Sequence, residues 1–367
     1  MKAALALLVA LTVGAAAPPQ LRVRDPAVHE YVLRNARGMT VRFLDYGATI
    51  TAVETPGRDG RIANVVLAYG RTSDYPALNH KNNFGAVIGR YAGRIAHARF
   101  SIDGREYRLR PNMGAHALHG GADPGFDKRL WTVRRFREGP VDAAELRLVS
   151  PDGDQGFPGT LTATVTYRLL PGNALRIDYA ARTTEPTVLN LTNHSYFNLA
   201  GGGSVSPQRL RIAAARWVET DAQGIPTGRF APLAGTPLDF RRERAIGERI
   251  DHKGGPMSGP GYNHGWLFDA PTDGRPRPVV WMRDPGSGRT LTVETTEPSV
   301  QVYTGDYFDG LDIDAHGRAI ERRGGIALET QGLADAPNRP GFPSTLLRPG
   351  RTFRSTTIWR FGVSRVR

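Results

Sequence analysis

The segment Leu161-Thr-Ala-Thr-Val-Thr-Tyr-Arg-Leu169 alternates apolar and polar residues at every step. Its apolar side chains share one face of an extended chain, while three threonines and Arg168 share the other. This period of two is typical of a β-strand with one buried and one exposed face. The segment therefore predicts a strand that packs on a core.

The same alternation recurs along the rest of the chain, at residues 174–182, 290–295, 299–303 and 352–361. Turn residues separate these segments, in keeping with 43 glycines and 27 prolines, and no amphipathic helix longer than about three turns is apparent. So many half-buried strands need two packed layers to cover their apolar faces. We therefore predict an all-β fold, a large antiparallel β-sandwich, and one domain over residues 18–367 because no linker or internal repeat interrupts it.

The first 17 residues have the layout of a secretory signal peptide. A positive start, Met1-Lys2, precedes an apolar run over residues 3–13 and the small residues of Gly14-Ala-Ala-Ala17. We expect cleavage near residues 15–17 and a periplasmic or secreted protein with no membrane association after cleavage. The chain has no cysteine, which excludes a lipoprotein anchor and disulfides.

The basic composition does not indicate nucleic-acid binding. The formal net charge is +13, but the positive residues are mostly arginines scattered singly along strand-like segments, often beside acids. No long basic run or zinc-finger spacing is present. An arginine-rich surface explains the charge better than a nucleic-acid footprint.

The segment Asn190-Leu-Thr-Asn-His-Ser-Tyr-Phe-Asn-Leu199 is unusually polar for a buried strand. Buried amides and hydroxyls need hydrogen-bond partners, so this composition favours a strand whose polar face lines a pocket for a hydroxyl-rich ligand. His194 lies at its centre and is a candidate for proton transfer to that ligand. A structural histidine held by neighbouring amides is the alternative.

Glu329 is a candidate partner for this histidine. It follows the apolar start of Ile326-Ala-Leu-Glu-Thr-Gln-Gly332, where partial burial would raise the pKa of a carboxyl group. Such a carboxylate is a good general base near neutral pH. A salt-bridged glutamate at a strand end remains the alternative.

Three further motifs contain side chains that could bind a polar ligand. In residues 85–95, Arg90 and Arg94 each follow a glycine, and Arg94 is the better candidate for directing its guanidinium at a ligand because another apolar alternation follows it. Leu118-His-Gly-Gly121 fits a sharp turn or a close approach of the backbone to a ligand. Gly261-Tyr-Asn-His-Gly-Trp-Leu267 combines amide, imidazole and aromatic groups suited to sugar rings. Each motif has a simpler explanation. The arginines of residues 85–95 could form surface ion pairs, residues 118–121 a surface turn, and residues 261–267 the ordinary start of a strand.

Taken together and in this order, the motifs make the chain resemble the aldose 1-epimerase (galactose mutarotase) family over nearly its whole mature length. The resemblance implies a galactose mutarotase-like supersandwich that interconverts the α and β anomers of free hexoses such as glucose and galactose, without cofactor or metal. The motifs that carry it lie at residues 89–95, 118–121, 193–199, 236–241, 261–264, 328–331, 338 and 342–343.

The resemblance also implies roles for individual residues. Glu329 matches the general base that takes the proton of the C1 hydroxyl, and His194 the general acid that protonates the ring oxygen. The positions expected to bind or support the substrate are Arg94, His119, Tyr196, Asn263 and Gln331.

Position 263 departs from the family pattern, because many relatives have an aspartate where this chain has Asn263. An amide both donates and accepts hydrogen bonds but carries no charge. We therefore expect hydroxyl binding that is weaker or tuned to another sugar.

Other functions on the same fold remain as alternatives. A non-catalytic carbohydrate-binding or sensor protein would not need both His194 and Glu329. A glycoside hydrolase would need a second suitably placed carboxylate. A hexose-6-phosphate 1-epimerase would need extra basic residues at the pocket, which Arg90 could supply. We expect a small aldose as the partner and a monomer or homodimer.

Overall fold

Strands and turns form nearly all of the computed structural model, which describes residues 27–122, 124–257, 259–269 and 273–364. Within these ranges the one α-helix is α1 (Asp74–Leu78). No helix in them is long and apolar enough to span a bilayer. The predicted all-β class is confirmed, whereas the predicted signal peptide lies outside the described residues.

One layer is a nine-stranded sheet in which all neighbours are antiparallel. The alternating segments 161–169, 174–182, 290–295 and 352–361 fall on four of its strands, as predicted. In spatial order the strands are β10 (Thr132–Glu138), β11 (Val141–Ser150), β12 (Leu161–Leu170), β13 (Ala174–Thr183), β27 (Phe353–Val363), β23 (Arg289–Thr295), β22 (Arg277–Arg283), β17 (Arg209–Ile212) and β20 (Arg244–Ala245).

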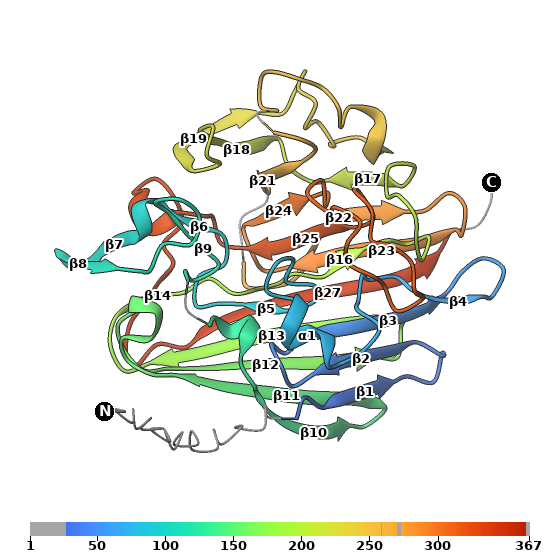
Figure 1. The fold of residues 1–367 in the computed structure, drawn as a ribbon, viewed down its shortest axis with the longest axis horizontal. Coiled ribbons are helices and arrows are strands. Elements are labelled where there is room, and N and C mark those ends of the chain that lie inside the picture. Colours follow the sequence, from blue (N-terminus) through green and yellow to red (C-terminus); the bar gives the residue numbers. More distant parts are fainter. Residues whose placement is uncertain (1–26, 123, 258, 270–272, 365–367) are drawn as a thin grey trace, which may run out of the picture.

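Two smaller antiparallel sheets form the second layer, in front of the nine-stranded sheet in Figure 1. The six-stranded sheet consists of β16 (Tyr196–Phe197), β25 (Ile326–Gln331), β24 (Ser299–Tyr303), β21 (Asn263–Leu267), β18 (Arg216–Thr220) and β19 (Pro226–Pro232). The four-stranded sheet consists of β1 (Glu30–Arg34), β2 (Thr40–Leu44), β3 (Ile50–Pro56) and β4 (Ile62–Asn64). A bridge between Val66 and Phe197 joins the two sheets.

A continuous apolar core lies between the two layers. Val165 on β12, Val302 on β24 and Phe43 on β2 are fully buried in the same cluster, although they belong to three different sheets. The alternation of each strand therefore directs one face inward, and this burial drives the two layers together.

Short two-stranded ribbons carry Arg94 and end directly before His119 and His194. They pair β5 (Val87–Ile88) with β15 (Thr192–Asn193), β6 (Arg94–Ile95) with β9 (Ala117–Leu118), β7 (Arg99–Ile102) with β8 (Arg105–Arg108), and β14 (Thr187–Val188) with β26 (Leu346–Leu347).

The prediction of one continuous strand over residues 190–199 is wrong, because the segment splits into β15 and β16, which pair with different partners. Its asparagines hold the backbone of neighbouring segments instead of facing a ligand. Asn190 donates to the carbonyls of Ala92 and Gly332, Asn193 to that of Gly85, and Asn198 to those of Gly203 and Gly324.

Candidate active site

One face of the six-stranded sheet packs on the core through residues such as Val302 and Leu328, and the opposite face forms the floor of the candidate site. In the register between β24 and β25, Gln301 lies directly opposite Glu329. Across β24, Tyr303 lies opposite Asn263 of β21. Because successive side chains of a strand point to opposite faces, Gln331 shares the face of Glu329. The sheet thus gathers five polar or aromatic side chains on one surface.

His194 lies between β15 and β16 and is fixed by its main chain. Its N–H donates to the carbonyl of Ala86 (2.9 Å), and its carbonyl accepts from the N–H of Gly85 (3.1 Å). Thr192 ties the segment to β25 by donating from its hydroxyl to the carbonyl of Thr330 (3.0 Å). These contacts place His194 Nε2 3.6 Å from Glu329 Oε1.

The two side chains are buried but each has an atom free for a ligand. His194 is 5 % exposed and Glu329 3 %. His194 Nδ1 and Glu329 Oε2 have no hydrogen-bond partner among the described residues. Burial raises the pKa of Glu329, while the charges of His194 and Arg94 act in the opposite direction. A carboxylate with a raised pKa, next to an imidazole, is suited to exchanging protons with a bound molecule.

His119 occupies the turn after β9, with a left-handed φ of 53°. Its ring meets that of His194 edge to face, 5.4 Å between centroids. The N–H of Gly93 donates to His119 Nδ1 (3.2 Å), so the proton of the neutral ring lies on Nε2. Burial, with His194 and Arg94 nearby, lowers the pKa of His119 well below its usual range. His119 is therefore a neutral hydrogen-bond donor.

His119, His194 and Glu329 could in principle hold a metal ion, since one ligand atom from each lies within 4.8 Å of the others. Two histidines and a carboxylate are a common zinc set. The bond from Gly93 argues against this role, because it leaves the proton of His119 on the nitrogen that would have to bind the metal. The donor set fits the oxygens of an organic ligand better.

Arg94 enters the site from β6. Its guanidinium lies against the backbone of Gly224, where an added Cβ would come within 3.2 Å of Arg94 Nε and Cζ. Arg94 Nε and Gln331 Oε1 are buried without a hydrogen-bond partner among the described residues. Both predicted binding residues therefore bring an unsatisfied polar atom to the same region.

Asn263 and Gln301 form an amide pair beside them. Gln301 Nε2 donates to Asn263 Oδ1 (2.8 Å), which orients both amides. His264, the next residue on β21, is buried on the opposite side, where its Nε2 bonds to the carbonyl of Pro256 (2.9 Å). Burial lowers the pKa of His264 to about 4. The sequence did not single out Gln301, and only its position opposite Glu329 marks it as a site residue.

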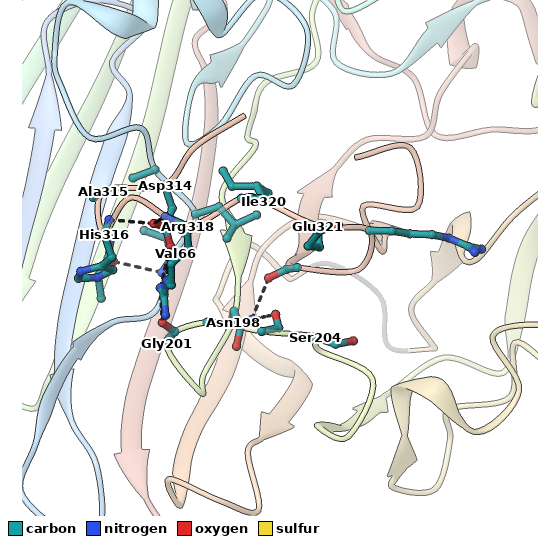
Figure 2. Close-up of a pocket in the computed structure, with 18 residues that line it drawn as sticks. Val66, Asn198, Gly201, Ser204, Asp314, Ala315, His316, Arg318, Ile320 and Glu321 are labelled. Atoms are coloured by element: carbon teal, nitrogen blue, oxygen red, sulfur yellow. Dashed lines mark hydrogen bonds and ion pairs between the residues drawn. The ribbon is translucent and has the colours of Figure 1, made fainter. Parts of the chain in front are cut away.

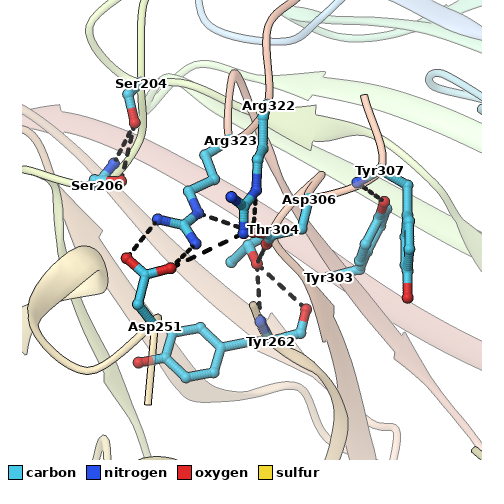
Figure 3. A network of polar contacts seen from close by, with 10 residues as sticks. All are labelled: Ser204, Ser206, Asp251, Tyr262, Tyr303, Thr304, Asp306, Tyr307, Arg322 and Arg323. Carbon is cyan, nitrogen blue, oxygen red and sulfur yellow. Dashed lines mark hydrogen bonds and ion pairs between the residues drawn. The ribbon is translucent and has the colours of Figure 1, made fainter. Parts of the chain in front are cut away.

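A row of aromatic rings leads from His194 to the surface. The ring centroid of Tyr196 lies 5.0 Å from that of His194 and 5.9 Å from that of Tyr303. The ring centroids of Tyr303 and Tyr307 are 6.3 Å apart, and Tyr307 is 64 % exposed. Figure 3 shows the rings of Tyr303 and Tyr307 side by side, and the N–H of Tyr307 donates to the hydroxyl of Tyr303 (3.0 Å). The ring of Tyr196 therefore packs against the imidazole of His194.

The loop that carries Tyr307 is held by a buried carboxylate. Asp306 accepts from Nε of Arg322 (3.0 Å) and Arg323 (2.8 Å) and from the hydroxyl of Thr304, and Arg323 also pairs with Asp251 (Figure 3). A buried carboxylate with several charge-assisted bonds fixes the backbone around it. The rim of the site is therefore anchored from the side away from the catalytic pair.

A separate cavity of about 340 Å³ lies beyond Asn198 and contains none of the predicted site residues (Figure 2). Three of its polar side chains are bonded to protein groups. Asp314 pairs with Arg318, Arg318 donates to the carbonyl of Gly201, and Asn198 donates to main-chain carbonyls. These bonds commit the three side chains to holding the surrounding loops.

Arg90 lies away from the pocket and cannot bind a ligand there. Its fully buried guanidinium donates to Ser150 Oγ (2.9 Å) and to the carbonyls of Ser150 (2.9 Å), Pro151 (2.7 Å) and Pro158 (2.9 Å). The expectation that Arg90 could supply a phosphate-binding charge is wrong, because every nitrogen of the guanidinium serves the fold.

We predict that Arg90→Met destabilises the protein by about 3–4 kcal/mol, because four acceptors, three of them buried, lose their donor. Arg105→Gln is the control, since Arg105 is exposed on β8, and should change the free energy of unfolding by less than about 0.5 kcal/mol. Urea unfolding of both variants measures the difference. A loss below about 1 kcal/mol for Arg90→Met would contradict the structural role.

Comparisons with known proteins point to one family. A family model described as Aldose 1-epimerase matches residues 29–360. The galactose mutarotase of Bos taurus is 40 % identical over 328 residues, covering 89 % of this chain and 92 % of that protein. The aldose 1-epimerase of Escherichia coli (strain K12) is 38 % identical over 333 residues, covering 90 % and 94 %.

Solved structures agree. The galactose 1-epimerase of Lactobacillus acidophilus NCFM superposes with a TM-score of 0.82 at 27 % identity, covering 94 % of this chain and 97 % of that one. The GalM/aldose epimerase homologue from C. elegans gives a TM-score of 0.83 at 26 % identity, covering 92 % and 100 %.

Proposed function

Because the chain belongs to the aldose 1-epimerase family, we propose that this site opens and recloses aldose rings with Glu329 as the base and His194 as the acid. The protein is an isomerase that interconverts the α and β anomers of aldoses. The observation that carries the residue assignment is the pair itself. Its facing atoms are 3.6 Å apart, and each partner keeps one unbonded buried atom.

In the first half of the reaction, ionised Glu329 takes the proton of the C1 hydroxyl while protonated His194 gives its proton to the ring oxygen. The bond between C1 and the ring oxygen breaks, and C1 becomes the carbonyl carbon of the open-chain aldehyde. Glu329 is now protonated and His194 neutral. No proton is gained or lost overall.

In the second half, rotation about the C1–C2 bond turns the other face of the carbonyl toward the C5 hydroxyl. His194 takes the proton of that hydroxyl as its oxygen attacks C1, and Glu329 returns its proton to the carbonyl oxygen. The ring closes as the other anomer, and both side chains regain their starting states. The two half-reactions together need one acid and one base, and the site provides both.

The surrounding groups hold the sugar without competing for protons. His119 is a neutral donor, and Arg94 and Gln331 each bring a buried atom that lacks a partner. Because the pKa of His119 is lowered, it adds no second positive imidazole beside protonated His194. We propose that these three side chains, with Asn263, bind the hydroxyl groups of hexoses such as glucose and galactose.

Polarimetry tests the activity. Freshly dissolved α-D-glucose and α-D-galactose should reach their equilibrium rotation faster with the protein than in buffer alone, in proportion to protein concentration. A rate equal to that of buffer would contradict the enzyme proposal and favour a binding protein. Release of new reducing ends from oligosaccharides would instead point to a glycoside hydrolase.

We also propose that the protein is exported, on the strength of the charged start, apolar run and small residues within residues 1–17. Expression of the full chain in a Gram-negative host should release to the periplasm a protein that begins near residue 16–18. N-terminal sequencing of the periplasmic and cytoplasmic fractions measures this. An uncleaved chain confined to the cytoplasm would contradict export.

A further inference from the structure

A recess without acidic residues adjoins the catalytic pair. Its polar lining includes the Arg94 guanidinium and the amides of Asn263, Gln301 and Gln331, together with Thr220, His264 and Ser299. No aspartate or glutamate is among the described residues that line it. Gln301 and Gln331 also belong to the floor on which Glu329 lies, so the recess is continuous with the site. Among the described residues of this lining, Arg94 carries the positive charge, and no carboxylate accompanies it.

Arg94 is an unpaired cation in this recess. No carboxylate of the described residues comes within 4.0 Å of its guanidinium, and its Nε is buried without a partner. Glu329 and Asp221 act on it only from farther away, and Asp221 Oδ1 already accepts from two main-chain N–H groups. Unlike the buried guanidinium of Arg90, which donates to a hydroxyl and three carbonyls, Arg94 has no acceptor for its Nε among the described residues. A ligand carboxylate would supply both the missing acceptor and the opposite charge.

Asn263 removes the negative charge that would repel such a ligand. Its Oδ1 is occupied by Gln301 Nε2, so its own amide N–H groups are the part left for a ligand. An aspartate at this position would both neutralise Arg94 and repel a second carboxylate. The amide instead adds donors beside the guanidinium, which suits a ligand oxygen that carries negative charge.

We propose that the substrates of this site include uronic acids, aldoses whose terminal carbon is a carboxylate, and that Arg94 and Asn263 bind this carboxylate. The inference rests on the proposed function, because the acid–base pair acts on C1 and the ring oxygen and leaves the terminal carbon unchanged. Arg94 can bind a carboxylate through two parallel hydrogen bonds, which a neutral hydroxymethyl group cannot match.

Matched ligands provide the first test. Mutarotation of D-glucuronate, its neutral analogue D-glucuronamide, D-glucose and D-galactose is followed by polarimetry at pH 7 and fixed ionic strength, with the enzyme-free rate subtracted. We expect kcat/KM for the glucuronate anion to exceed that for the amide by about tenfold or more, mainly because KM for the anion is lower. This is the effect expected of one partly desolvated charge pair.

The variant Asn263→Asp provides the second test. It should lower the ratio of kcat/KM for glucuronate to kcat/KM for glucose by about tenfold, because the new carboxylate takes the place of the ligand's carboxylate beside Arg94 and repels it. Arg105→Gln changes the net charge by the same amount at an exposed site on β8. It should leave kcat/KM for glucuronate and for glucose unchanged. Circular dichroism checks that both variants fold.

The outcomes separate this inference from the proposed function. Equal kcat/KM for glucuronate and glucuronamide, with glucose turned over, would overturn the uronic acid assignment and leave the epimerase intact. A glucuronate preference that Asn263→Asp leaves unchanged would also overturn it, because the recess would not be its source. Failure to turn over any of the four sugars would overturn both.

Discussion

Glu329→Gln is expected to lower kcat for mutarotation by about a thousandfold, because the neutral amide cannot take the proton of the C1 hydroxyl. The variant should nevertheless be more stable than the parent at pH 7. Burial raises the pKa of Glu329 in the folded protein, so the native state loses stability as pH rises through that pKa, and glutamine removes this loss. The stability difference should vanish below about pH 4, where the unfolded chain is also protonated.

Glu297→Gln is the matched control, since Glu297 is also buried (9 % exposed) and lies outside the site. Burial raises its pKa to about 7, so this variant should show a similar gain in stability without loss of kcat. Polarimetry and thermal unfolding at pH 4 and pH 7 separate the two effects. Glu329→Gln with near-parental kcat would rule out Glu329 as the base.

His194→Gln is expected to lower kcat by about a hundred- to a thousandfold, because glutamine can occupy the space but cannot protonate the ring oxygen. A residue that only binds the sugar would raise KM and leave kcat almost unchanged. Initial rates over a range of sugar concentrations distinguish these cases.

His316→Gln, at an exposed position, is the control and should leave both constants unchanged. If His194→Gln changed KM alone, His194 would be a binding residue and the acid would have to be sought elsewhere. His119 would be the first candidate, since its ring lies against that of His194.

Local patterns predicted the sandwich because a half-buried strand leaves its period in its own sequence. Residues 161–169 show this, since their apolar face is fully buried as the alternation indicates. Residues 190–199 show the limit, because their polar groups indicate a need for partners without saying whether those partners are ligand or backbone. Only tertiary structure reveals that the asparagines bind carbonyl groups.

The sequence predicted which types of residue would form the candidate site, but not which side chains would face the pocket. Arg90 and Arg94 follow glycines in the same local pattern, yet one guanidinium is enclosed by carbonyls and the other faces the pocket. Gln301 has no local signal, because an amide within a strand becomes part of the site only through the register that sets it opposite Glu329. Such distinctions depend on contacts between segments far apart in the chain.

The way His194 is attached has a consequence for folding kinetics. It is held by the main chain at residues 85–86, and its segment is tied through Thr192 to Thr330, 138 residues farther along the chain. Closing contacts of such long range is slow compared with forming hairpins between neighbouring strands. During refolding, strand content should therefore return before enzymatic activity, and the regain of turnover should mark the moment when the distant segments have joined.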